Sequence, residues 1–200
     1  DDPHTVMILR SQAAGLSDFV REGTAVSGKA TPYWHERTTW TPIEEAALSA
    51  EQAGQRERAV AARDAMAKAL FARLDAALVE GGPAGAIAVC KEEAPQIAAA
   101  TAEAHGVRIG RTSHRLRNPV NRPPEWAESL LTEQPAEARF AAGSNGALGA
   151  AFPIRLAPNC LACHGDPGSI APEARAALAE AYPADRATGF EVGEIRGWFW

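Results

Sequence analysis

The sequence lacks an excess of basic residues, a long apolar run and a recognisable signal peptide. With 20 Lys and Arg against 25 Asp and Glu, its formal net charge is −5, which argues against non-specific binding to nucleic acid or anionic lipid. No apolar run approaches the roughly 20 residues that a helix needs to cross a bilayer. The remaining balance, 46% hydrophobic and 22% charged residues, is typical of a soluble globular protein.

The N-terminal residues suggest an exported protein. The chain begins Asp1-Asp2-Pro3-His4, which we interpret as a mature N-terminus left after removal of a signal peptide. We expect residues 1–40 to form an extension and residues 41–200 to form one domain. Three aromatic residues near the boundary are expected to pack on that domain, the alternative being a docking surface for a partner; they are Tyr33, Trp34 and Trp40.

The first half of the domain predicts two long helices. Thr41 as N-cap, Pro42 as first residue and Glu44 as a capping-box partner predict a helix that starts near residue 41 and runs to residue 80. The sequence Gly81-Gly82-Pro83 predicts its end. A second helix is expected over residues 84–104, with Pro95 as the position of a kink or break.

The second half predicts strands and one short helix. Residues 107–111, 139–142, 148–156 and 192–200 have the pattern of strands, and residues 172–181 that of a helix. Helices followed by strands indicate an α+β fold with an antiparallel sheet.

The sequence Cys160-Leu161-Ala162-Cys163-His164 is the pattern that attaches a c-type haem. Two thiols three residues apart can each bond one haem vinyl group, and the following histidine is then placed under the iron. A zinc site would need two further ligands, for which no second paired motif is present. A thioredoxin-like dithiol would open a helix after a strand, whereas here a turn, Gly165-Asp166-Pro167-Gly168, follows. We therefore predict one covalent haem c with His164 as an iron ligand.

The sequence alone leaves the opposite iron ligand open. Methionine and histidine are the usual choices, but the chain has only two methionines. The remaining free cysteine, Cys90, lies on the apolar face of the second predicted helix, where a buried thiol is also an ordinary core residue. The other candidates are Met7, Met66, His4, His35, His105 and His114.

Four segments resemble a family of single-haem, PAS-like c-type domains, found at the sensory end of bacterial histidine kinases and cyclases and free-standing in a cyanobacterial photosystem II-associated haem protein. The segments are Ala86–Ala98, Ile109–Asn121, Cys160–Gly165 and Tyr182–Gly197. The resemblance implies a PAS-like antiparallel sheet with long N-terminal helices. It also implies His/Cys ligation of the iron, with Cys90 opposite His164.

The resemblance places a basic segment beside the haem. We expect this segment to neutralise the haem propionates, since arginine pairs well with carboxylates; the alternative is a solvated basic strand. The residues concerned are Arg111, Arg115, Arg117 and Asn118. Trp126 follows the family's pattern as well, and we expect it to have a packing role.

Three functions follow from these expectations. The first is a redox-sensing haem protein whose Cys90 leaves on reduction and opens a site for CO or NO. The second is a one-electron carrier to a periplasmic or photosynthetic partner. The third is a sulfur-oxidising haem enzyme. The single haem motif and the lack of an evident acid/base pair argue against this function.

Overall fold

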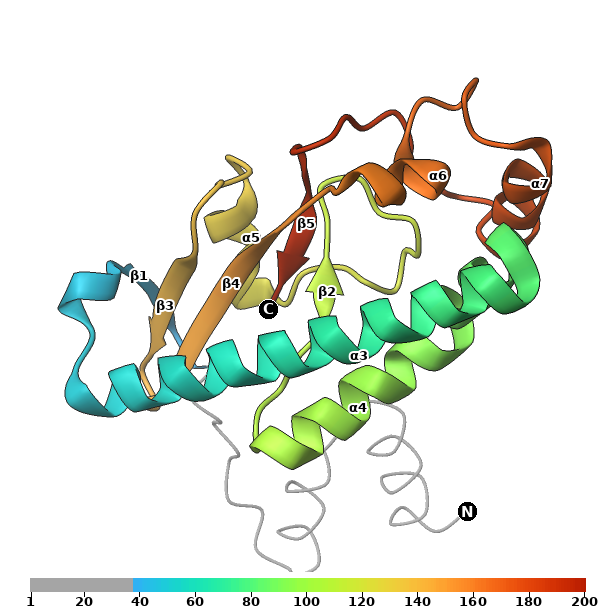
Figure 1. Cartoon of the computed structure of the whole chain (residues 1–200). Helices are drawn as coiled ribbons and strands as arrows, with labels where there is room; N and C mark the ends of the chain where they lie inside the picture. The colour runs from blue at the N-terminus through green and yellow to red at the C-terminus, as the bar shows by residue number, and fades with distance from the viewer. Residues whose placement is uncertain (1–37) are drawn as a thin grey trace, which may run out of the picture. The chain divides into compact units, whose positions relative to one another are not determined.

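The computed structural model describes residues 38–200, which contain a five-stranded antiparallel sheet and a long N-terminal helix (Figure 1). The predicted α+β class is therefore confirmed. The sheet has the order β1-β3-β4-β5-β2, so β4 is its central strand, between β3 and β5. The strands are β1 (Trp40–Ile43), β2 (Arg111–Thr112), β3 (Arg139–Gly143), β4 (Leu148–Arg155) and β5 (Ile195–Phe199). Tyr33 and Trp34 lie outside the described residues.

Alternate side chains of strand β4 pack against helices on opposite faces of the sheet. Phe152 and Ala150 pack with Phe140 against helix α3 (Ala50–Ala88). Ala151 points to the other side, where it packs with Trp198 and helix α5 (Glu125–Leu131). Successive residues of a strand face opposite sides of its sheet, so helices cover both faces of β4.

The first helix begins eight residues later than its sequence suggests. Thr41 and Pro42 pair with Ala142 and Ala141 as part of β1, and Trp40 stacks on Trp126 with ring centroids 5.5 Å apart. The helix starts at Ala50, after a 3-10 turn, η1 (Glu45–Ala47). Ser49 and Gln52 form the actual capping box. The predicted start at Thr41 is wrong because a long-range strand pairing outweighs a local capping pattern, whereas the packing role of Trp126 is confirmed.

Helix α3 turns back on itself at Gly82, where the backbone has φ 60° and ψ −158°. Glycine adopts this conformation at little cost, so the predicted stop at Gly81-Gly82-Pro83 is correct. The two arms then run side by side (Figure 1). Gly85 makes this possible, since a Cβ there would lie 2.9 Å from the carbonyl oxygen of Ala77.

The returning arm is interrupted by a π-helical turn, η2 (Val89–Glu93), before helix α4 (Ala94–His105). The amide of Ala94 donates to the carbonyl of Val89, five residues back. Pro95 follows directly and has no N–H to donate, so a regular helical ladder cannot pass through this point. The predicted disturbance at Pro95 is confirmed, and Cys90 lies within it.

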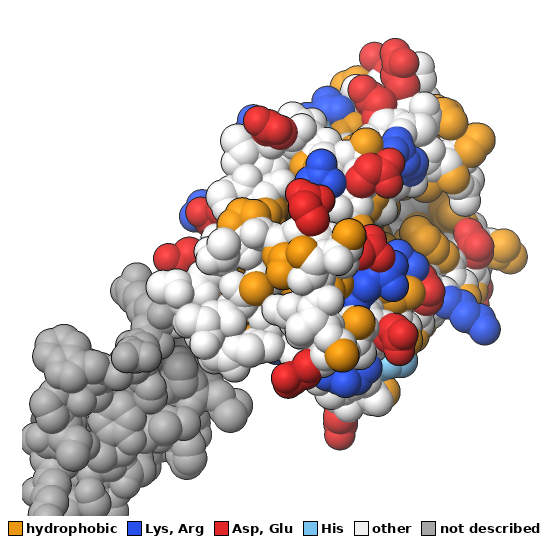
Figure 2. Space-filling model, turned by 90° about the vertical axis from the view of Figure 1, so that its left-hand side faces the viewer, with side chains coloured by type: hydrophobic (Ala, Val, Ile, Leu, Met, Phe, Trp, Pro, Cys, Tyr) orange, Lys and Arg blue, Asp and Glu red, His pale blue; other side chains and the backbone are white. Residues whose placement is uncertain are grey.

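The remaining elements are short. They are η3 (Pro158–Cys160), α6 (Leu161–His164) and α7 (Pro172–Ala181). The first strand was predicted over residues 107–111, but only Arg111 of that range belongs to β2 (Arg111–Thr112). The last strand is shorter than expected, because β5 begins at Ile195 after a turn at Gly193. None of the helices within residues 38–200 combines the length and apolar character needed to cross a membrane. On the face shown in Figure 2, acidic and basic side chains are interspersed.

Candidate functional site

A cavity of about 1310 Å³, a volume that includes solvent at its mouth, joins the helical hairpin to the sheet and to α6. Its lining includes Cys90 from η2 and all three reactive residues of the motif, Cys160, Cys163 and His164. Seventy residues separate Cys90 from Cys160 in the sequence, so the fold alone brings them to one cavity. Much of the wall is apolar and comes from both arms of α3: Leu70, Phe71, Leu74, Leu78, Ala86 and Ile87.

Both cysteines of the motif carry free thiols. Cys163 packs beside Ile87, Leu178 and Tyr182, and burial raises the pKa of its thiol. Cys160 packs against the neighbouring cluster that contains Leu156 and Phe190. The two thiols thus line the same cavity without being bonded to each other.

The imidazole of His164 is oriented through Nδ1. Its Nδ1 lies 2.7 Å from the carbonyl oxygen of Ala187. A carbonyl can only accept a hydrogen bond, so Nδ1 carries the proton and Nε2 is left with a free lone pair. Burial, with the charges of Arg117 and Arg196 adding to it, lowers the pKa of His164 to about 2. The ring is therefore neutral throughout the physiological pH range.

A loop from residue 185 to 190 holds the backbone around His164. The amide of Phe190 donates to the His164 carbonyl at 3.0 Å, and the amide of Gly189 donates to the Gly165 carbonyl at 2.7 Å. Asp185 supports this loop by accepting from the Ala187 amide at 2.7 Å. Every one of these bonds limits the movement of the short helix α6.

Cys90 has a different support. Its π-helical turn is tied to the first arm of α3 by Arg73, which donates from Nε and Nη2 to the Glu93 carboxylate at 2.7 and 2.9 Å. Arg73 and Glu93 have 36% and 39% of their side chains exposed. Solvent weakens such an ion pair, so Cys90 rests on a less firmly held segment than His164 does.

The four residues of the predicted basic segment take different positions. Arg111, Arg117 and Asn118 line the cavity, but Arg115 does not. Arg117 is already engaged, because its Nε donates to Asp185 at 3.0 Å and its Nη2 to the carbonyls of Cys163 and Ala187. Arg115 lies over the ring of Phe190, 3.5 Å from the centroid. Arg111 faces the cavity, and burial lowers the pKa of its guanidinium.

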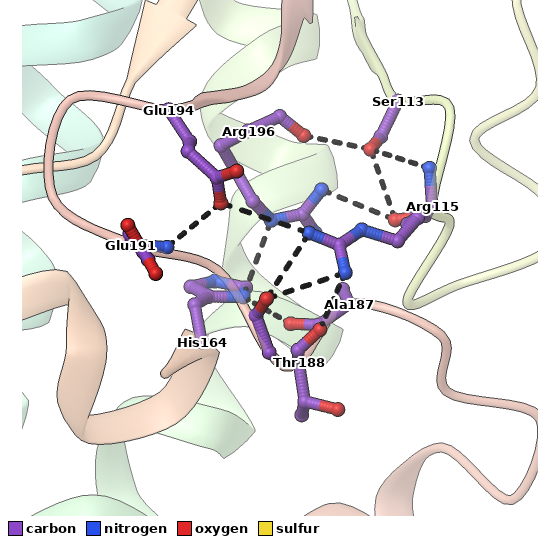
Figure 3. Close-up of polar contacts among 9 residues, drawn as sticks. Ser113, Arg115, His164, Ala187, Thr188, Glu191, Glu194 and Arg196 are labelled. Carbon is purple, nitrogen blue, oxygen red and sulfur yellow. Dashed lines mark hydrogen bonds and ion pairs between the residues drawn. The ribbon is translucent and has the colours of Figure 1, made fainter. Parts of the chain in front are cut away.

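Sequence reasoning missed Arg196, which lines the cavity from β5. Its Nε lies 3.2 Å from Nδ1 of His164, and its Nη1 donates to the Arg115 carbonyl at 3.3 Å. Figure 3 shows the guanidinium of Arg196 between His164 and Arg115. Arg196 belongs to a segment that carries the family resemblance, which was the signal available for finding it.

The alternative ligands named from the sequence do not line the cavity as far as the structure describes them. Met66 is buried, and His114 stacks edge-on against Phe190 and Trp198; neither contributes to the cavity wall, nor does His105. His4, Met7 and His35 lie outside the described residues. Within residues 38–200, no three His, Cys, Asp or Glu side chains gather as a metal site would require.

Comparison with known families gives a match to the Tll0287-like family model over residues 36–200. The chain belongs to the Tll0287-like family. Among solved structures, the crystal structure of the cyanobacterial heme-protein Tll0287 matches with a TM-score of 0.51 and 23% sequence identity, over 76% of this chain and 94% of that one. The likeness to that structure shows a shared fold. No protein of curated function matches the sequence.

Proposed function

We propose that this member of the Tll0287-like family is an exported protein with one haem c, held by Cys160 and Cys163 and ligated by His164 and Cys90. Its proposed role is redox sensing through a change at Cys90. The observation that carries the proposal is the single cavity lined by Cys90 and by the complete Cys-x-x-Cys-His motif. The similar fold of the heme-protein Tll0287 supports it.

The residues present fit such a group in three respects. Cys160 and Cys163 have unbonded thiols, His164 has Nε2 available, and an apolar wall covers one side of the cavity. A bound haem would supply an iron that exchanges one electron. Arg111 and Asn118 are the cavity residues suited to bind its propionate carboxylates, because Arg117 is already paired with Asp185 and Arg196 is held against His164 and the Arg115 carbonyl.

Cys90 would contribute a negative charge to the site, and Arg111 faces the same cavity as a counter-charge. A thiolate binds ferric iron more strongly than ferrous iron, so reduction should weaken the hold on Cys90. The π-helical turn gives this residue room to move, since π turns are local irregularities that often mark functional positions. Cys90 is therefore the proposed switching ligand, with CO or NO as possible ferrous ligands.

The proposal includes export, because c-type haem is attached outside the cytoplasm. It includes a redox partner protein and no catalysed reaction. The rival proposal, a one-electron carrier, requires that both ligands stay bound in both oxidation states, because reorganisation slows electron transfer.

Covalent attachment is tested first. The full chain, expressed with an export signal in cells that mature c-type cytochromes, should carry the mass of one haem through denaturation. Changing Cys160 and Cys163 to Ala together should abolish that mass increase. An unmodified mass for the unsubstituted chain would refute the proposal.

The role of Cys90 is tested by Cys90→Ala, with Cys90→Ser as the closest control in size. Loss of the thiolate should change the ferric visible and EPR spectra, and unchanged spectra would exclude Cys90 as a ligand. The unsubstituted protein, once reduced with dithionite, should bind CO. If the reduced protein stays six-coordinate and does not bind CO, the carrier function replaces the sensor function.

A further inference from the structure

Arg196 occupies an unusual place for a cation, beside the ring nitrogen of a buried histidine. The 3.2 Å from its Nε to His164 Nδ1 is within hydrogen-bond range, but Nδ1 already donates its proton to Ala187. A protonated nitrogen cannot also accept from Arg196. The contact therefore brings a positive charge against the donor side of the ring without sharing a proton.

The surroundings hold this cation in place. Ser113 donates from its hydroxyl to the Arg196 carbonyl at 2.6 Å, and the guanidinium is fixed by the Arg115 carbonyl. Gly197, the next residue, packs so tightly that a Cβ there would lie 2.1 Å from the Thr112 carbonyl oxygen. Strand β5 is thus locked against β2, and Arg196 has little freedom to swing away from His164.

The charge of Arg196 is not cancelled locally. Within residues 38–200, its side chain forms no ion pair with a carboxylate; the nearby Glu194 carboxylate lies 3.9 Å from Arg115 instead. An arginine side chain stays protonated in proteins, so Arg196 is charged at neutral pH. Charges in a partly buried site interact more strongly than in water.

We propose that Arg196 is a positioning residue for His164 that also raises the reduction potential of the haem iron. It fixes the Nδ1 edge of the imidazole, and its charge would favour the electron-rich ferrous state of a bound haem. A second cation, Arg117, donates to the same Ala187 carbonyl at 3.2 Å, which adds a further positive charge on this side of His164. This inference rests on the proposed haem attachment.

The test is a spectroelectrochemical titration of the haem-loaded full chain with Arg196→Gln. Removal of the cation should raise the ferric-to-ferrous ratio at a fixed solution potential by about tenfold, equivalent to about 59 mV for one electron. Arg196→Lys keeps the charge and should restore most of the potential. The ferric EPR spectrum of the glutamine variant should also broaden, as the orientation of His164 becomes less defined.

Arg155→Gln is the matched control. Arg155 also lines the cavity, but it is exposed and donates to the carbonyls of Gly193 and Ala136. Its removal changes the charge equally and should shift the ratio much less. Equal shifts in the Arg196 and Arg155 variants, or no shift in either, would overturn the inference.

Glu194→Gln provides a test that does not depend on the stability of the Arg196 variants. This change removes an exposed negative charge beside Arg115 and leaves an amide oxygen to accept from the Glu191 backbone. The potential should rise slightly, opposite in sign to the Arg196→Gln effect; a fall or no change counts against the inference. A chain without covalent haem would refute the proposed function, whereas a haem-loaded chain with unmoved potentials would refute this inference alone.

Discussion

His164 and Cys90 line the same cavity, yet the chain supports them in different ways. His164 lies in a four-residue helix whose backbone and ring are bonded to the loop at residues 185–190. Cys90 lies in a π-helical turn tied to the first arm of α3 by a partly exposed ion pair. A site with one fixed and one yielding support suits a ligand exchange on the yielding side. The comparison also predicts where substitutions will be costly.

The largest effect is expected on the His164 side, from Asp185→Ala. Asp185 and Arg117 have only 13% and 8% of their side chains exposed, so the substitution leaves a buried guanidinium without its counter-charge. Removing one partner of a buried pair costs about 3–5 kcal/mol. The free energy of unfolding, measured with urea, should fall by that amount. A loss below about 1 kcal/mol would mean that the His164 side is not the firmly held one.

The sequence predicted the parts of this comparison that depend on local pattern. Residues 172–181 are α7 as expected, and the glycine stop at Gly82 is correct. The capping pattern at Thr41 misled because Ser49 and Gln52 offer an equivalent one, and only the pairing of β1 with β3 decides between them. Local pattern cannot reveal such a long-range choice.

The same limit explains what was missed in the site. Arg196 reaches His164 only because β5 pairs with β4 and β2 across the sheet, and no spacing rule encodes that contact. The sequence prediction assigned the same role, propionate binding, to all four residues of the basic segment. The fold separates them by burial and by partner, with Arg115 directed to Phe190 and Arg117 to Asp185.

A smaller effect is expected at Tyr182, which packs on Ile87 from the Cys90 arm and on Cys163 from the motif. Burial, together with the nearby Cys90 charge, raises the pKa of Tyr182 to about 12. Because the unfolded phenol ionises near pH 10, the folded state should lose stability as pH rises above about 10, by about 1.4 kcal/mol per unit until pH 12. Tyr182→Phe should remove this loss.

The chain contains only two tyrosines, Tyr33 and Tyr182, so ultraviolet titration of the unsubstituted and Tyr182→Phe proteins isolates the phenol of interest. Cys90→Ala should lower the pKa of Tyr182, because it removes a nearby negative charge. An ordinary pKa near 10 would show that the two sides do not meet at Tyr182.

The smallest effect on stability is expected on the Cys90 side, from Glu93→Ala. The ion pair it breaks is partly exposed, and solvent-accessible pairs contribute little to folding, so the urea midpoint should barely move. Local opening of the π turn should nevertheless become easier, because Arg73 no longer ties it to the first arm of α3. Amide exchange at residues 89–93 should therefore accelerate while exchange in α6 stays unchanged.

Glu80→Ala is the matched control, since Glu80 also contacts Arg73, at 3.5 Å, but lies outside the turn. Faster exchange in both variants would indicate that Arg73 acts through α3 as a whole. Unchanged exchange in the Glu93 variant would show that the turn is rigid without this ion pair, and that Cys90 is as firmly supported as His164.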